Sequence, residues 1–167
     1  THMTNTYYNE SDANWTPDGK RISYLAKGQL WEMNPDGSGA KQITQIEGGI
    51  NGYLYAPDGS KIAYYKDIKM EPTVQDMHPD LPKAKARIIN DQFYRHWNDW
   101  VEGYTHIFIA DYTPAQPITS GQDIMKDEKW ESPVRPWGGT EQLAWTRDGQ
   151  RRIYTCRKKY CLDYAFS

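Results

Sequence analysis

The chain has 167 residues, enough for one domain with a hydrophobic core and too few for two comfortable ones. Its 20 Lys and Arg residues nearly balance 22 Asp and Glu residues, so the net charge offers no general attraction for nucleic acid or an anionic membrane. No apolar run approaches the roughly 18 residues that a membrane-spanning helix requires, so no membrane span is expected either.

The aromatic residues favour β-structure. They make up 14 % of the chain, as 13 Tyr and 7 Trp but only 3 Phe. Rings with a polar edge suit sheets that pack on one face and meet water on the other. The first three residues, Thr-His-Met, are typical of a cloning remnant, and the folded part is expected over residues 4–167.

A β-hairpin is predicted for residues 14–25, "NWTPDGKRISYL". In a turn over residues 17–19 the proline fixes φ, the aspartate bonds to nearby N–H groups and the glycine takes the positive φ that closes the turn. Ile22 and Tyr24 then share one face of the returning strand.

The same hairpin recurs at residues 53–65, "YLYAPDGSKIAYY", and at residues 143–155, "LAWTRDGQRRIYT". An aromatic residue stands three positions before each Asp and a tyrosine six positions after it: Trp15, Tyr55 and Trp145, then Tyr24, Tyr64 and Tyr154. In the third copy Arg152 replaces the isoleucine of the other two. This change predicts either a β-bulge or an arginine that reaches out to solvent.

Each of the first two copies continues into two more strands. In the first they are expected over residues 30–34 and 42–44, and in the second over residues 107–111 and 117–119, where Pro-Ile-Thr matches Gln-Ile-Thr. Four antiparallel strands in about 40 residues is the period of a propeller blade. The predicted fold is therefore all-β, a partial β-propeller of about two and a half blades: a blade over 12–47, a blade over 50–120 and an incomplete blade over 138–167.

Residues 66–105 interrupt the second blade. The strand period lapses there, and apolar residues recur every three to four positions, as on one face of a helix, at Ile89, Phe93, Trp97, Trp100 and Val101. Pro82 suits the first position of a helix, and Gly103 suits a C-terminal cap. A helical insertion that projects from the blade edge is predicted.

The pattern W-x-P-D-G-x-x-I-x-Y, L-W-x-M-N, Q-I-T resembles the WD40-like (PD40) repeat of TolB-type propellers and of the N-terminal propeller of prolyl oligopeptidase family serine peptidases. Residues 80–111 and 138–167 are similar to the bacterial dipeptidyl-peptidase IV and acylaminoacyl-peptidase members. The resemblance implies a truncated propeller that gates and orients peptide substrates, near the insertion, for an α/β-hydrolase domain in the same polypeptide but outside this chain. It also implies a periplasmic or secreted location.

No catalytic residue is expected in the chain itself. A peptidase of this family needs a serine in a Gly-x-Ser-x-Gly turn, followed by Asp and His, and none of the seven serines stands in that motif. Glu102 in "DWVEG" resembles part of the acidic motif by which dipeptidyl peptidases hold a free N-terminus, but the second glutamate is missing. Glu102, Arg95 and His96 are the candidate substrate contacts, and a solvated carboxylate at a helix end is the alternative for Glu102.

Cys156 and Cys161 are close enough in sequence for a hairpin to bring them within disulfide distance, and two free thiols are the alternative. One cysteine pair without a nearby histidine falls short of a zinc site, so no metal or cofactor is expected. The basic residues between 151 and 159 are interpreted as solvated strand edges and not as a nucleic-acid site.

Two and a half blades cannot close a ring, which takes about four to eight. We therefore expect either a piece of a longer peptidase or copies that associate through open blade faces. The alternative function is a TolB-like module that binds partner proteins through its blade loops, with no associated enzyme. The insertion favours the peptidase, because a simple interaction module has little need of it.

Overall fold

The computed structural model describes residue 4 and residues 7–70, 72–89, 95–96, 99–100 and 103–158, with the backbone alone for 95–96 and 99–100. Antiparallel strands dominate. The elements in chain order are β1 (Glu10–Trp15), β2 (Ile22–Ala26), β3 (Gln29–Met33), β4 (Lys41–Gln42), β5 (Gly52–Tyr55), β6 (Lys61–Lys69), α1 (Val74–Met77), β7 (Arg95–His96), β8 (Asp99–Trp100), β9 (Gly103–Asp111), β10 (Gln122–Asp123), the 3₁₀ turn η1 (Thr140–Gln142), β11 (Leu143–Trp145) and β12 (Arg152–Tyr154).

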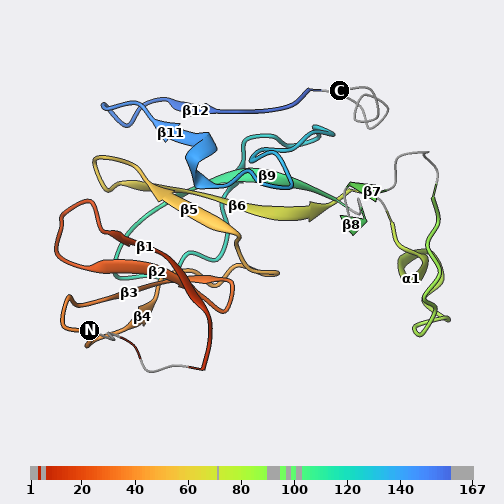
Figure 1. Cartoon of the computed structure of the whole chain (residues 1–167), viewed down its shortest axis with the longest axis horizontal. Helices are drawn as coiled ribbons and strands as arrows, with labels where there is room; N and C mark the ends of the chain where they lie inside the picture. The colour runs from red at the N-terminus through yellow and green to blue at the C-terminus, as the bar shows by residue number, and fades with distance from the viewer. Residues whose placement is uncertain are drawn as a thin grey trace.

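Strands β1, β2, β3 and β4 form one antiparallel sheet in chain order, and β5, β6, β9 and β10 form a second one in the same way. We call these sheets blade 1 and blade 2, and the hairpin β11–β12 blade 3. The three lie in layers, with blade 2 between the other two (Figure 1). The prediction of an all-β fold built from four-stranded antiparallel units is confirmed.

The three Asp-Gly turns are close copies of one another. Gly19, Gly59 and Gly149 have φ angles of 68°, 69° and 68°, in the left-handed region that favours glycine. The Asp18 carboxylate accepts hydrogen bonds from the Thr16 hydroxyl at 2.7 Å and the Lys20 backbone N–H at 3.1 Å. These bonds lower the pKa of Asp18 below its ordinary value.

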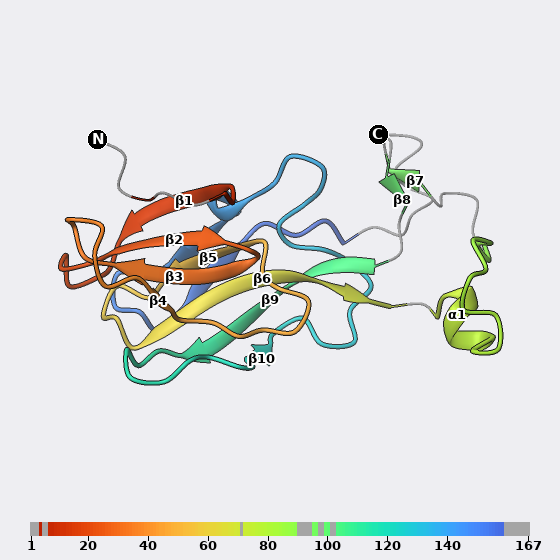
Figure 2. The ribbon, with the colours of Figure 1, turned by 90° about the horizontal axis from the view of Figure 1, so that it is seen from below.

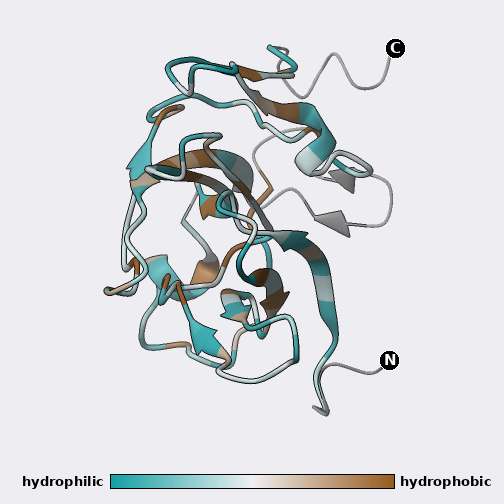
Figure 3. Ribbon diagram, turned by 90° about the vertical axis from the view of Figure 1, so that its left-hand side faces the viewer, coloured by the Kyte–Doolittle hydropathy of each residue, from teal (hydrophilic) through white to brown (hydrophobic). Residues whose placement is uncertain are grey.

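The core consists of two clusters, one on each face of blade 2. After Lys61, strand β6 has four consecutive buried residues, 62–65, because its neighbours cover both faces of the sheet. Ile62 and Tyr64 pack toward blade 1, whereas Ala63 and Tyr65 pack toward blade 3. By contrast, β1 is exposed along almost its whole length. Figures 2 and 3 show the arrangement from below and by hydropathy.

The third hairpin keeps a regular register, so the predicted bulge at Arg152 is absent from it. Arg152 pairs with Trp145, as Ile62 pairs with Tyr55 in blade 2. The exposed Arg152 guanidinium lies 4.9 Å from the centroid of the Trp145 ring, a cation–π contact, which is the second of the two alternatives. A register shift occurs instead in β1, between Ser11 and Asn14, just before the first copy.

The fourth strand of blade 2 lies beyond the predicted boundary at residue 120. Residues 122–123 pair with 108–109 of β9, as 41–42 pair with 31–32 of β3, so the match of 117–119 to 42–44 was wrong. Ile118 instead forms an isolated parallel bridge with Thr44 and joins the two blades. Three matching letters were too little to place a two-residue strand.

The predicted helix of the insertion is also wrong where the structure describes it. Arg95–His96 and Asp99–Trp100 pair as antiparallel strands β7 and β8, and residues 79–89 contain only turns and irregular backbone. Aromatic residues favour strands, and this preference outweighed a helical spacing supported by few positions. Strands β6 and β9 run to residues 69 and 103, so the interruption is shorter than the predicted 66–105.

Within the described ranges the one α-helix is the four-residue α1, at the far end of the molecule from blade 1 in Figure 2. None of the helical segments there has the length and hydropathy to cross a membrane.

Candidate functional site

The insertion leaves blade 2 from the ends of its two longest strands. Strands β6 and β9 pair over nine residues, up to Lys69 opposite Gly103. A Cβ atom at Gly103 would lie 2.1 Å from the carbonyl oxygen of Ile68, so only glycine fits there. The Thr105 hydroxyl donates to Oδ1 of Asp67 at 2.6 Å and ties the two strands side chain to side chain. The insertion therefore starts from a fixed base.

A loop after β10 holds this base from the blade 3 side. The Arg135 guanidinium donates to the carbonyl oxygen of Gly103 and, through Nε, to Oε2 of Glu131 at 2.7 Å. Glu131 is only 3 % exposed, so little water screens the attraction between the Glu131 carboxylate and the Arg135 guanidinium. The Ser132 backbone N–H donates to the carbonyl oxygen of Thr105 at 2.9 Å. Segments 131–135 and 103–105 are thus fastened together.

The structure places the predicted substrate contacts only in part. Arg95 and His96 lie in β7, within the insertion, but their side chains and the whole of Glu102 lie outside the described residues. Their roles therefore stay predictions. Asp76 of α1, in the same insertion, accepts hydrogen bonds from Thr73 and Lys69. In the described part of the chain, no three His, Cys, Asp or Glu side chains gather as metal ligands would.

A buried histidine links β9, β10 and the following loop. His106 is fully buried, with Nδ1 2.9 Å from Oδ2 of Asp123 and Nε2 3.1 Å from the carbonyl oxygen of Glu128. A carbonyl oxygen can only accept, so the network assigns a proton to Nε2. The ring shares a second hydrogen bond with the Asp123 carboxylate. Sequence analysis did not single out this pair, because 17 residues separate its members.

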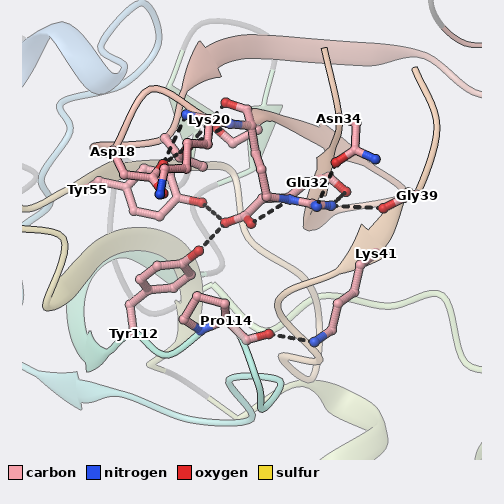
Figure 4. Close-up of polar contacts among 12 residues, drawn as sticks. Asp18, Lys20, Glu32, Asn34, Gly39, Lys41, Tyr55, Tyr112 and Pro114 are labelled. Carbon is pink, nitrogen blue, oxygen red and sulfur yellow. Dashed lines mark hydrogen bonds and ion pairs between the residues drawn. The ribbon is translucent and has the colours of Figure 1, made fainter. Parts of the chain in front are cut away.

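A second buried group, which we call the Glu32 cluster, joins blade 1 to blade 2 (Figure 4). Glu32 is 1 % exposed, and its Oε1 accepts hydrogen bonds from the hydroxyls of Tyr55 and Tyr112, each at 2.6 Å. Nε of Arg21 lies 3.4 Å from Oε2. The same guanidinium also donates to the side chain of Asn34. Each of these contacts pairs a donor with an acceptor, as a buried carboxylate requires.

Burial raises the pKa of Tyr55 and Tyr112 far above the ordinary value, and the hydrogen bond to Glu32 raises it further. Burial also raises the pKa of the neighbouring Tyr53 to about 12. All three side chains are therefore neutral donors at physiological pH. The hydrogen bonds of this cluster hold blades 1 and 2 in position relative to each other.

The sequence held a signal for Glu32 that the prediction did not use. Leu30 and Glu32 are two positions apart in the strand, so their side chains lie on the same face, and Leu30 shows that this face is the buried one. A carboxylate on a core face requires partners from a neighbouring element. Tyr112, however, is 80 residues away and no local pattern points to it.

The described cysteine, Cys156, lies two residues after β12 and is half-buried, and burial raises the pKa of its thiol. Cys161 lies outside the described residues, so the disulfide stays a prediction.

Comparison with known proteins gives relatives over almost the whole chain. It is 43 % identical over 157 residues to dipeptidyl-peptidase 5 of Porphyromonas endodontalis and 44 % identical over 169 residues to dipeptidyl-peptidase 5 of Porphyromonas gingivalis. These matches cover 92 % and 99 % of this chain. A 57-residue stretch is 32 % identical to the uncharacterized peptidase YuxL of Bacillus subtilis, covering 31 % of this chain and 9 % of that protein.

No known family profile matches the chain. Among solved structures, that of a putative TolB from Agrobacterium tumefaciens has 16 % sequence identity and a TM-score of 0.47, over 89 % of this chain and 38 % of that one.

The chain spans 23 % and 25 % of the two Porphyromonas proteins. The resemblance to bacterial dipeptidyl peptidases, drawn from residues 80–111 and 138–167, is confirmed by these relatives. The chain is thus a homologue of about a quarter of each of these two dipeptidyl peptidases, and it is built from four-stranded antiparallel sheets.

Proposed function

We propose that the chain forms part of the propeller of a serine exopeptidase and helps to gate and orient peptide substrates for an α/β-hydrolase domain elsewhere in the same polypeptide. The observation that carries the proposal is the identity of 43–44 % to two dipeptidyl peptidases over nearly the whole chain. The chain itself contains no Gly-x-Ser-x-Gly turn, so the proposal assigns it no catalytic step.

The insertion is the part proposed to meet the peptide. It starts from the paired ends of β6 and β9, which Arg135 and Thr105 fasten. An element on such a base can present side chains at a constant position, which favours recognition over loose tethering. The proposed contacts are Glu102, for the ammonium group at the N-terminus of the peptide, and Arg95 and His96.

The test replaces residues 70–102 with Asn-Gly in the longer protein. Lys69 and Gly103 are opposite each other, so a two-residue turn can close the β6–β9 hairpin and leave the blade intact. We expect kcat/KM for a dipeptidyl substrate to fall at least about tenfold, or 1.4 kcal/mol, while hydrolysis of a small activated ester persists. Equal loss of both activities, with an unchanged melting temperature, would contradict a role in substrate orientation.

Point substitutions distinguish the contacts. Glu102→Gln should raise KM for a substrate with a free N-terminus but not for the same substrate acetylated there, whereas a solvated Glu102 leaves both KM values unchanged. Asp80→Asn, in the same insertion, is the matched control for removing one acidic group. The isolated chain should hydrolyse neither substrate.

We also propose a periplasmic or secreted location for the protein, which a Cys156–Cys161 disulfide would suit. Cell fractionation, with thiol alkylation before and after reduction, tests both points. Recovery in the cytoplasm with two alkylated cysteines would exclude them.

A further inference from the structure

Trp137 lies on the loop that connects β10 to β11. It is 81 % exposed, a high value for the largest apolar side chain. Between residues 103 and 142, all of which the structure describes, no other large apolar side chain is exposed. Exposed tryptophan rings are frequent contact points for ligands, because one ring supplies a large, flat apolar surface.

The loop is fastened to blade 2 on both sides of Trp137. Before it, the Arg135 guanidinium donates to the carbonyl oxygen of Gly103, at the base of the insertion. After it, the Thr140 hydroxyl lies 3.4 Å from the hydroxyl of Tyr65 in β6. Trp137 therefore lies at the end of blade 2 from which the insertion leaves.

Hydrogen bonds within the loop also fix the backbone that carries the ring. The Val134 N–H donates to Oε1 of Gln142 at 2.8 Å, and the Gly138 N–H donates to the carbonyl oxygen of Val134 at 2.9 Å. A Cβ atom at Gly138 would lie 2.3 Å from that carbonyl oxygen, so the backbone closes tightly beside Trp137. A side chain on a backbone fixed in advance loses less conformational entropy when it binds a ligand.

We propose that Trp137 contacts the peptide substrate, and that the face of its indole ring binds an apolar side chain of the first residue of the peptide. The inference rests on the proposed function, which brings the peptide to the base of the insertion. In a dipeptidyl peptidase the second residue of the peptide lies at the scissile bond, which the hydrolase domain must hold. The first residue is thus the one left for the propeller to recognise.

The hydrolase domain itself fits Trp137 less well than a peptide side chain does. A stable interface buries about 800 Å² on each partner and has several apolar side chains at its centre. The residues after Trp137 are Gly138, Gly139, Thr140 and Glu141, and the Glu141 carboxylate accepts a hydrogen bond from the Gly139 N–H. A single ring beside small and polar residues matches the size of one side chain.

Oxidative footprinting of tryptophan, read by mass spectrometry, tests the contact without an activity assay. The longer protein is oxidised alone, with the dipeptide Phe-Ala and with Gly-Ala, each dipeptide at the highest soluble concentration. A phenylalanine ring on one face leaves about half of the Trp137 ring accessible, so Phe-Ala should lower its oxidation rate about twofold, and Gly-Ala should lower it less. Equal rates with and without Phe-Ala would overturn the proposal.

Two comparisons in the same experiment check the choice of occupant. The rate at Trp15, on blade 1, should not respond to either dipeptide, and a matching fall there would show a general effect and count against the contact. If Trp137 is already far better protected in the longer protein without peptide than in the isolated chain, another part of the polypeptide covers it. That result would overturn the peptide as the occupant.

Substitution tests the selectivity that the contact should produce. The readout is the ratio of kcat/KM for a Phe-Ala substrate to that for a Gly-Ala substrate with the same leaving group. We expect Trp137→Ala to lower this ratio about fivefold and Trp137→Phe, which keeps a ring, to lower it less. An unchanged ratio in Trp137→Ala would overturn the proposal. The melting temperature should change by less than about 2 °C, because Trp137 is exposed.

This proposal and the proposed function fail separately. Protection of Trp137 by Phe-Ala in a longer protein without peptidase activity would refute the proposed function alone. Peptidase activity that depends on the insertion, with neither protection of Trp137 nor a change in the ratio, would refute the Trp137 contact alone.

Discussion

Replacing Tyr55 with Phe removes one hydroxyl from the contact between blades 1 and 2. That hydroxyl donates to Oε1 of Glu32 at 2.6 Å, and the carboxylate is 1 % exposed. The ring keeps its edge-to-face contacts with Tyr53 and Tyr112, whose centroids lie 5.7 and 5.1 Å away. The change therefore isolates one hydrogen bond to a buried charge.

A hydrogen bond to a charged group contributes about 1.5–3 kcal/mol to stability. Tyr112 and Arg21 still stabilise the carboxylate in Tyr55→Phe, so we expect the lower end, a loss of about 1.5–2 kcal/mol. With a urea m value of about 2 kcal/mol/M, the unfolding midpoint should fall by about 0.8–1 M.

Urea unfolding of the isolated chain, followed by circular dichroism, measures the effect. Tyr7→Phe is the matched control, because Tyr7 is fully exposed, and should change the free energy of unfolding by less than about 0.5 kcal/mol. A midpoint for Tyr55→Phe equal to that of Tyr7→Phe would refute the reasoning. Because Tyr55 and Tyr112 donate to the same oxygen, Tyr55→Phe/Tyr112→Phe should depart from additivity by at least about 0.5 kcal/mol, and additive losses would contradict the shared acceptor.

Three further predictions concern stability at high pH, a backbone contact and the base of the insertion. Burial raises the pKa of Tyr53 to about 12 and that of Tyr55 further, so the stability these residues contribute is complete below pH 10 and is lost as the pH rises above 10. Urea midpoints should therefore fall from pH 10 upward, less steeply in Tyr55→Phe than in the parent chain, and equal slopes would count against burial as the cause. Gly49→Ala should cost at least about 1 kcal/mol, because φ is 79° and the new Cβ would lie 2.9 Å from the carbonyl oxygen of Gly28. Gly59→Ala, with φ 69° but no atom closer than 3.5 Å, should cost less in the same urea assay, and the reverse order would contradict the steric argument. Arg135→Ala should speed amide hydrogen exchange of residues 103–105, while the control Lys61→Ala, which breaks the exposed ion pair with Asp111 at the other end of the same strands, should leave it unchanged; equal rates in both variants would show that the Arg135 contact does not hold the base.

The turns and blades were predictable because their causes are local. An Asp-Gly pair with an aromatic residue three positions earlier fixes the hairpin register within a dozen residues. The departure of Arg152 from the isoleucine of the other two copies was visible in the sequence for the same reason. The choice between a bulge and an exposed arginine, however, depended on the contact with Trp145. The cation–π contact depends on the distance between the two strands of the hairpin, which the sequence does not reveal.

Contacts between distant segments were not predictable. Glu32 finds Tyr112 across 80 residues, and Ile118 crosses between blades where the sequence match made it the fourth strand. In the insertion, the aromatic residues satisfy a helical period and a strand propensity at once, and a single sequence gives no means of choosing between the two. The substrate contacts Glu102, Arg95 and His96 were inferred from a resemblance and stay predictions.

Both faces of blade 2 are covered by a neighbouring blade. Both of its surfaces belong to clusters shared with a neighbour, whereas blade 3 contributes to only one cluster, through Leu143 and Trp145 of β11. In a stack where each layer contacts only the next, disruption starts at an end and moves inward. The hairpin of blade 3 should therefore detach first on heating or under mechanical load, and the four-stranded pair of blades 1 and 2 should persist as the last cooperative unit.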